Sequence, residues 1–139
     1  MIIICIPGKP QGKERPRFAK RGSFVKVYTD AKTASYEDRV RLFARQRMGA
    51  CAPLDGPVVV ALSLTMLPPA SWPKSKRQDA IDGKILPEVK PDLDNCAKIV
   101  MDACNGIVYL DDKQVVDLHV SKRYGMIEEV VMRVHPHGA

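Results

Sequence analysis

The order of hydrophobic and polar residues along the chain predicts several short strands. A β-branched run opens the chain and stops at Pro7-Gly8, as expected of a buried strand. The clearest strand is Val58 to Met66, where every second residue is apolar and falls on one face. Near the end, two stretches separated at Tyr124-Gly125 predict an antiparallel pair. The predicted strands cover residues 1–6, 23–28, 58–66, 114–123 and 128–134.

Two longer stretches carry apolar residues at helical spacing. In residues 29–49 an apolar stripe includes Tyr36 and Val40, while the arginines lie mostly elsewhere, which is typical of a solvated helix face. Residues 93–105 place apolar side chains at i, i+3, i+4, i+7, i+8 and i+11, and Gly106 follows as a stop. Three residues are alternative caps for the first helix: Asp30, Thr33 and Ser35.

Two other stretches have the composition of loops. Residues 8–22 contain two prolines, three glycines and six Lys/Arg, and residues 67–91 contain five prolines among scattered lysines. A loop as long as the second is usually functional or disordered. The element order is strand, strand, helix, strand, helix, strand, strand. It predicts an α/β fold of α+β-like type, with a mixed sheet and two helices packed on it, as a single domain over residues 1–139.

Composition adds limits to this picture. With 139 residues, 45% of them hydrophobic, the chain can bury a real core without a disulfide or metal. Its four cysteines include no C-x-x-C pair, so a structural zinc site is not expected. They are predicted to be small buried hydrophobes in a reducing compartment. No apolar run is long enough to span a membrane, and we expect a soluble, cytoplasmic protein.

Charge is distributed unevenly along the chain. Residues 1–50 hold 12 Lys/Arg against 4 Asp/Glu, whereas residues 51–139 hold 10 against 12. This asymmetry favours a polyanion-binding surface beside a carboxylate site, although a solvated flexible arm is an equally simple interpretation of the basic residues. Trp72 would either stack on an exposed base or anchor its loop on the core. The candidate DNA-binding residues are Lys9, Lys13, Arg15, Arg17, Lys20, Arg21, Lys74 and Lys76.

Two acidic pairs flank the second predicted helix. Asp92 and Asp94 lie where the loop meets the helix, and the free N–H groups there favour carboxylates. The simplest interpretation is N-capping. Lys98 follows Asp94 by one helical turn, away from the core stripe. The second pair, Asp111-Asp112, follows the helix, and Asp112 reaches the first pair only if the intervening residues return along the helix.

Convergence of Asp92, Asp94 and Asp112 would require a cation. Three carboxylates repel one another unless a hard cation neutralises them, and oxygen ligands select Mg²⁺ or Mn²⁺ over zinc. Such a site next to basic residues suits phosphodiester hydrolysis, with Lys98 as a fixed cation near the phosphate.

The residues K-P-D-L-D-N-x-x-K and D-A-C-N-G-I-V-Y-L-D-D-K-Q-V-V-D, within 89–123, closely resemble the RusA family of Holliday junction resolvases, common in phages and prophages. The basic opening G-K-P-Q-G-K-E-R-P-R-F matches more loosely. The resemblance implies a homodimeric, Mg²⁺-dependent enzyme that nicks four-way junctions symmetrically, with Mn²⁺ as a possible substitute. It implies Asp92, Asp94 and Asp112 as metal ligands and Lys98 as the catalytically important lysine. Asp111 matches the first acid of its pair, with no defined role.

Two other function classes compete with a resolvase. One is a DNA-binding protein without catalysis, in which the acids only cap and solubilise; a metal-dependence assay separates it from a nuclease. The other is a D-x-D phosphotransferase, which usually places its first Asp after a buried apolar strand, whereas Glu88-Val89-Lys90 precedes Asp92. His119 either flanks the site or is an ordinary residue of a sheet face.

Overall fold

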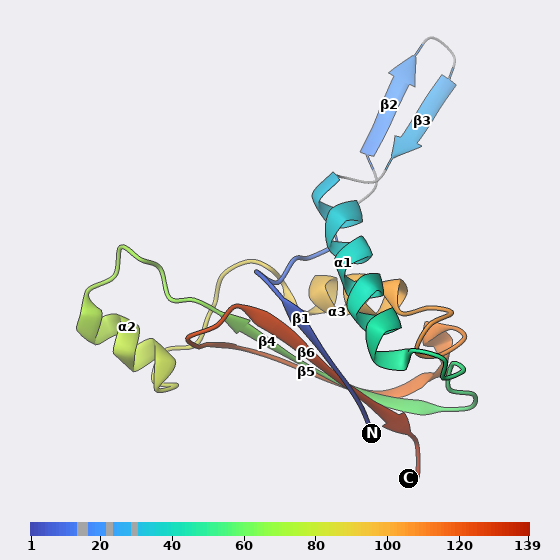
Figure 1. Ribbon diagram of the computed structural model, residues 1–139. Coiled ribbons are helices and arrows are strands. Elements are labelled where there is room, and N and C mark those ends of the chain that lie inside the picture. The colour runs from blue at the N-terminus through green and yellow to red at the C-terminus, as the bar shows by residue number, and fades with distance from the viewer. Residues whose placement is uncertain (14–16, 22–23, 29–30) are drawn as a thin grey trace.

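The computed structural model describes residues 1–13, 17–21, 24–28 and 31–139 (Figure 1). Its strands are β1 (Ile2–Pro7), β2 (Arg17–Arg21), β3 (Phe24–Tyr28), β4 (Val58–Met66), β5 (Val115–Tyr124) and β6 (Glu129–Pro136). Its helices are α1 (Ala31–Met48), α2 (Lys74–Ile81), α3 (Leu93–Ala103) and the short 3₁₀ turn η1 (Asp112–Gln114). The helices predicted over 29–49 and 93–105 and the strand predicted over 58–66 are therefore confirmed.

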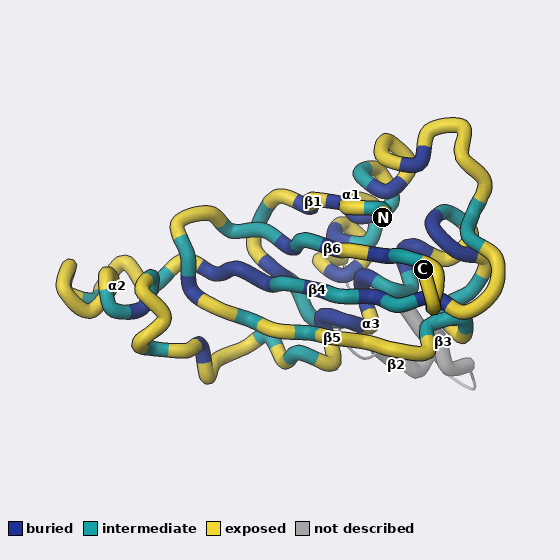
Figure 2. The backbone as a smooth tube through the Cα atoms, turned by 90° about the horizontal axis from the view of Figure 1, so that it is seen from below, coloured by how far each residue is buried: buried dark blue, intermediate teal, exposed yellow. Residues whose placement is uncertain are grey.

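Four strands form a mixed sheet in the order β1-β6-β4-β5. β6 is antiparallel to both β1 and β4, whereas β5 runs parallel to β4. Two helices, α1 and α3, cover one face of this sheet, and the view from below shows the other face open in front of them (Figure 2). The predicted mixed sheet with two packed helices is confirmed.

The last two strands are present and run antiparallel as predicted, but they do not pair with each other, because β4 lies between β5 and β6. β4 is buried at alternate positions and half-buried between them, so a strand on each side satisfies its backbone groups. The connection between β5 and β6 crosses the end of β4, where the Gly125 N–H donates to Met66 O at 2.9 Å. A side chain at Gly125 would meet Thr65 Cγ2 at 2.5 Å, so the crossing requires glycine.

The core lies between the sheet and the two helices. Alternate residues of the strands point toward the helices, and α1 and α3 supply the facing layer through residues such as Val40 and Val100. The apolar stripes predicted for both helices are therefore buried. Cys96 and Cys104 belong to this core, but Cys5 and Cys51 are exposed. The prediction that all cysteines are buried fails at Cys5 because the alternation of β1 turns it to the open face.

Two segments predicted as loops contain regular structure. Residues 67–91 include α2, which has Ala80 as its buried residue; it lacks the apolar stripe by which a helix is recognised. Ala80 packs with Met66 and Tyr124 in a small second cluster. Residues 8–22 include β2, which pairs with β3 in a separate two-stranded sheet. Its Arg- and Lys-rich composition hid this strand from the hydrophobic pattern.

Candidate active site

The two aspartates of the D-L-D segment lie at the start of α3. Asp92 is the N-cap residue, but its side chain makes no capping hydrogen bond. Asp94 lies in the first turn, and both residues are exposed. Within the described part of the chain, neither carboxylate has a hydrogen bond or an ion pair. N-capping by the Asp92 side chain therefore does not account for this residue. Among the described residues, nothing occupies the oxygen atoms of either carboxylate.

A lysine from the sheet holds the loop that leads to Asp92. Lys122 of β5 donates from Nζ to Val89 O at 2.7 Å and to Pro91 O at 3.2 Å. These two carbonyls lie on either side of Lys90, directly before the first aspartate. Lys122 thus fixes the backbone from which Asp92 projects.

The segment that follows β1, residues 8–13, crosses the same end of α3 and is called the N-terminal arm below. The Lys13 N–H donates to Asn95 O at 3.0 Å, and a Cβ at Gly12 would lie 3.1 Å from the Asn95 Cβ. Arm and helix border a groove of about 690 Å³. Four lysines and two aspartates are among the groove residues, which are Lys9, Pro10, Gln11, Gly12, Lys13, Lys32, Lys90, Pro91, Asp92, Asp94 and Asn95.

The chemistry of this groove fits a small hard cation together with an anion. Mg²⁺ is usually held by one or two carboxylates, with water and substrate phosphate filling its remaining positions. Asp92 and Asp94 supply such carboxylates, and lysines surround them. The groove therefore combines the ligands that Mg²⁺ prefers with the charges that a phosphate backbone requires.

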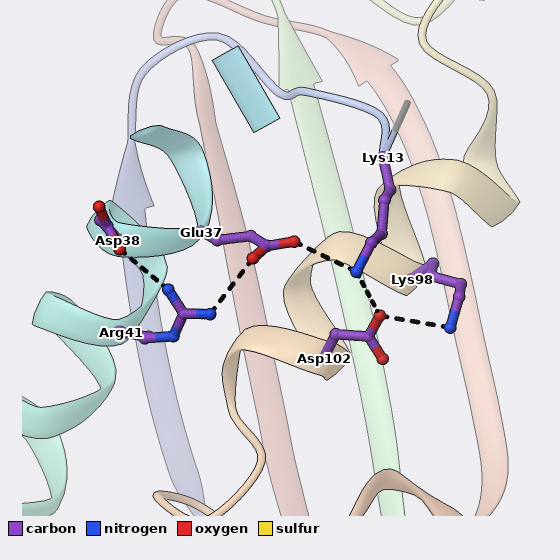
Figure 3. Close-up of polar contacts among 6 residues, drawn as sticks. All are labelled: Lys13, Glu37, Asp38, Arg41, Lys98 and Asp102. Atoms are coloured by element: carbon purple, nitrogen blue, oxygen red, sulfur yellow. Dashed lines mark hydrogen bonds and ion pairs between the residues drawn. The ribbon is translucent and has the colours of Figure 1, made fainter. Parts of the chain in front are cut away.

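The other end of α3 carries a carboxylate that the protein itself satisfies. Asp102 accepts from Lys13 Nζ at 2.8 Å and pairs with Lys98 Nζ at 3.2 Å, and Lys13 also pairs with Glu37 of α1 at 3.2 Å (Figure 3). Burial alone would raise the pKa of Asp102, but hydrogen bonds with Lys13, Asp112 and Lys98 outweigh it and lower this pKa. The contact with Lys98 has the i,i+4 spacing of a helical ion pair.

Asp112 lies beside Asp102 rather than beside the first acidic pair. Burial, together with hydrogen bonds to the carboxyl groups of Asp102 and Asp111, raises the pKa of Asp112. The returning chain does run along α3, since the Tyr109 hydroxyl donates to Met101 O at 2.8 Å. This segment brings Asp112 to the level of Asp102, which lies eight residues, or about 12 Å along the helix axis, beyond Asp94.

The three predicted metal ligands therefore do not meet in one group. Among the described residues, no set of three or more His, Cys, Asp or Glu side chains is arranged to hold a metal ion. Asp92 and Asp94 lie at one end of α3 and Asp112 at the other, with Lys98 between them on the helix. Their assignment as metal ligands remains a prediction.

Asp111 and Gln114 explain the D-D-x-Q part of the motif. Asp111 caps η1 by accepting from the Lys113 N–H at 2.9 Å. Gln114 Oε1 accepts from the Leu110 and Asp111 N–H groups, and its Nε2 donates to Leu54 O and Gly56 O. This capping box, readable from the spacing of the two residues, fixes the turn that presents Asp112.

The candidate DNA-binding residues divide between two regions. Lys9 and Lys13 border the groove, although Lys13 is engaged in its two ion pairs. Lys74 and Lys76 are exposed on α2, which stands apart from the two helices that cover the sheet (Figure 1). Arg15 lies outside the described residues, as do the side chains of Arg17, Lys20 and Arg21.

The surroundings of Trp72 and His119 decide between the two interpretations given for each from the sequence. Trp72 packs edge-on against Tyr124 with ring centroids 5.6 Å apart, and Lys76 Nζ lies 4.0 Å from the Trp72 ring centroid. This favours the anchoring interpretation of Trp72. His119 pairs with Asp117 at 3.0 Å, in register with Ala61 on the open face of the sheet, so it is a sheet-face residue.

Sequence reasoning missed the contacts of Asp102, Lys122 and Glu37. Asp102 gave a partial signal, because it follows Lys98 at the i+4 spacing of a helical ion pair. Lys122 gave no signal, because its partners Val89 and Pro91 lie 33 and 31 residues away in the loop before α3. Glu37 gave none, because its partner Lys13 lies in the N-terminal arm.

Comparison with known proteins agrees with the resemblance in the motif. The model of the family described as endodeoxyribonuclease RusA matches residues 7–135. The uncharacterized protein YqaN of Bacillus subtilis (strain 168) is 38% identical over 125 residues, which cover 88% of this chain and 87% of YqaN. No described helix is both long and apolar enough to cross a membrane. The chain belongs to the RusA family of endodeoxyribonucleases.

Proposed function

We propose that this protein is a Mg²⁺-dependent endonuclease that resolves four-way DNA junctions by symmetric nicking. The observation that carries the proposal is the groove at the start of α3, where two carboxylates that lack partners among the described residues are surrounded by lysines. A structural role would leave such carboxylates capped or ion-paired. Mn²⁺, which also prefers oxygen ligands, is expected to substitute for Mg²⁺.

Residues of the groove, together with Lys98 and Asp112 outside it, would have separate roles in phosphodiester hydrolysis. Asp92 and Asp94 would hold Mg²⁺, which supplies an activated water and stabilises charge on the phosphate when bound. Lys9 and Lys90 would hold the DNA backbone across the groove through phosphate contacts. Lys98, one turn along α3, carries a fixed positive charge toward the reacting phosphate, where negative charge develops. Asp112 is assigned to the metal site by the family motif.

We infer that the active form is a homodimer. A four-way junction has two-fold symmetry, and paired symmetric cuts require two sites related by the same operation. Light scattering at micromolar concentration should give twice the mass of one chain. A monomer that still makes paired cuts would contradict this inference.

The decisive experiment uses a labelled four-way junction and a linear duplex of the same sequence. With Mg²⁺ the protein should cut the junction at symmetric positions and leave the duplex intact, and EDTA should stop cleavage without preventing binding. Equal cutting of both substrates would indicate a nuclease without junction specificity. Tight junction binding without cleavage in Mg²⁺ or Mn²⁺ would favour the non-catalytic DNA-binding alternative.

A further inference from the structure

Asp102 connects three parts of the molecule through its carboxylate. It is bound by Lys13 of the arm at 2.8 Å and by Lys98 of its own helix at 3.2 Å. Its carboxyl group also lies next to that of Asp112 at the end of the returning chain. Figure 3 shows its carboxylate between the two ammonium groups. Two residues that the family motif assigns to catalysis thus meet at a residue that the motif leaves without a role.

The contact with Lys98 restricts a side chain that is otherwise mobile. The Lys98 side chain is 63% exposed, and a lysine has a flexible four-carbon stem whose rotamers cost free energy to fix. The Asp102 side chain is only 21% exposed, so it is the fixed partner of the pair. Within the described residues, Asp102 is the ion-pair partner of Lys98.

Lys13 in turn fixes Asp102. Its ammonium lies between the Asp102 and Glu37 carboxylates, at 2.8 and 3.2 Å. Glu37 is also bound by Arg41 at 3.2 Å. Asp102 is therefore tied through Lys13 to α1, and its position does not depend on α3 alone.

We propose that Asp102 is a positioning residue of the nuclease, which holds the Lys98 ammonium where it can act on the reacting phosphate. The proposal rests on the function proposed above. Lys13 belongs to the same device as the cation that fixes Asp102, and is not chiefly a phosphate contact.

The test compares Asp102→Asn, Lys98→Ala and the double variant in single-turnover cleavage of a four-way junction. Asparagine keeps the shape of Asp102 but removes its charge, so the cleavage rate should fall about 10- to 100-fold, as when a residue that orients an active-site group is removed. The dissociation constant for the junction should change little. The double variant should cleave no more slowly than Lys98→Ala alone, because Asp102 acts through Lys98.

Further variants separate positioning from stability. Asp102→Glu should recover part of the lost rate, and Lys13→Met should lower the rate in the same direction. Asp79→Asn is the matched control, since it breaks the Asp79–Lys84 pair, which has no contact with Lys13, Lys98 or Asp102 among the described residues, and it should leave the rate unchanged. If Asp102→Asn fails to fold, Asp102→Glu and Lys13→Met carry the same test.

Three results would overturn the proposal: a full cleavage rate in Asp102→Asn, a multiplicative loss in the double variant, or a change in the Mg²⁺ concentration for half-maximal rate. The last would assign Asp102 to the metal site. Failure of the unmodified protein to cleave would instead reject the proposed function. The network itself would still be measurable, as non-additive changes in unfolding free energy between Lys13→Met and Asp102→Asn.

Discussion

The two ends of α3 carry the same kind of side chain in opposite surroundings. At the N-terminal end, Asp92 and Asp94 are exposed and lack partners among the described residues. At the C-terminal end, Asp102 is partly buried between two lysines. The protein supplies the countercharge at one end and leaves it to a ligand at the other. The open end, which carries Asp92 and Asp94, is thus suited to bind a cation. The satisfied end, which carries Asp102, is suited to position a neighbouring side chain.

Removal of a carboxylate at the open end should have the largest effect. Asp92→Asn or Asp94→Asn should lower junction cleavage by about 1000-fold, because asparagine lacks the charge that holds Mg²⁺. Binding of the junction without metal should persist or tighten, because one source of repulsion toward the phosphates is gone. Cleavage kinetics and gel-shift binding measure the two effects. Normal cleavage in both variants would show that the open end is not the metal site.

Substitutions of Asp111 and Asp112 test whether the satisfied end of α3 also contributes to the reaction. Asp112→Asn should lower cleavage about 100-fold, if the family assignment holds for this chain. Asp111→Ala should lower the thermal unfolding midpoint by removing the cap of η1, while cleavage stays within a few-fold of normal. A large loss of activity in Asp111→Ala, without loss of stability, would transfer the role to Asp111.

A substitution of Lys122 tests whether the metal site requires the loop before Asp92 to be fixed by β5. Lys122→Met keeps the stem but removes the two hydrogen bonds to Val89 O and Pro91 O. The Mg²⁺ concentration for half-maximal cleavage should rise about 10-fold, the range expected when support of a ligand is lost. Lys122→Arg should lose less than Lys122→Met. An unchanged Mg²⁺ dependence in both variants would mean that the loop is held without this residue.

Salt dependence should distinguish the lysines of the groove. Each phosphate contact contributes about 0.9 to the slope of log affinity against log salt on duplex DNA. Lys9→Ala and Lys90→Ala should each flatten the slope by roughly this amount. Lys13→Ala should flatten it less, because its ammonium is already paired with Glu37 and Asp102. An equal effect of Lys13→Ala would mean that DNA displaces the ion pairs.

The smallest effect concerns the buried face of α3. Burial raises the pKa of both the Cys96 and Cys104 thiols to about 12, and the thiolate is the reactive form. A thiol reagent at neutral pH should therefore modify Cys5 and Cys51 quickly and the other two only on unfolding. Cys96 lies near the open end and Cys104 near the satisfied end. Faster modification of Cys96 would show that the open end is also the less stable one.

Local patterns predicted most of the core. The stripe from Leu93 to Cys104 specified both the helix and its buried face, and the alternation of Val58 to Met66 specified β4. α2 escaped prediction because its one buried residue, Ala80, creates no stripe. The direct pairing of the last two strands was wrongly predicted, because a turn residue at Gly125 does not reveal which strand lies beside β5.

The sequence by itself determined the family motif, the chemical types in the site, and the position of Asp92 and Asp94 at the start of a helix. These follow from local spacing, which a linear chain carries in full. Only the tertiary structure decided that Asp112 meets Asp102, that Lys122 holds the loop before Asp92, and that Lys13 is an internal countercharge. Each of these contacts joins residues far apart in the chain, and depends on which strands become neighbours and how far a returning segment travels along its helix.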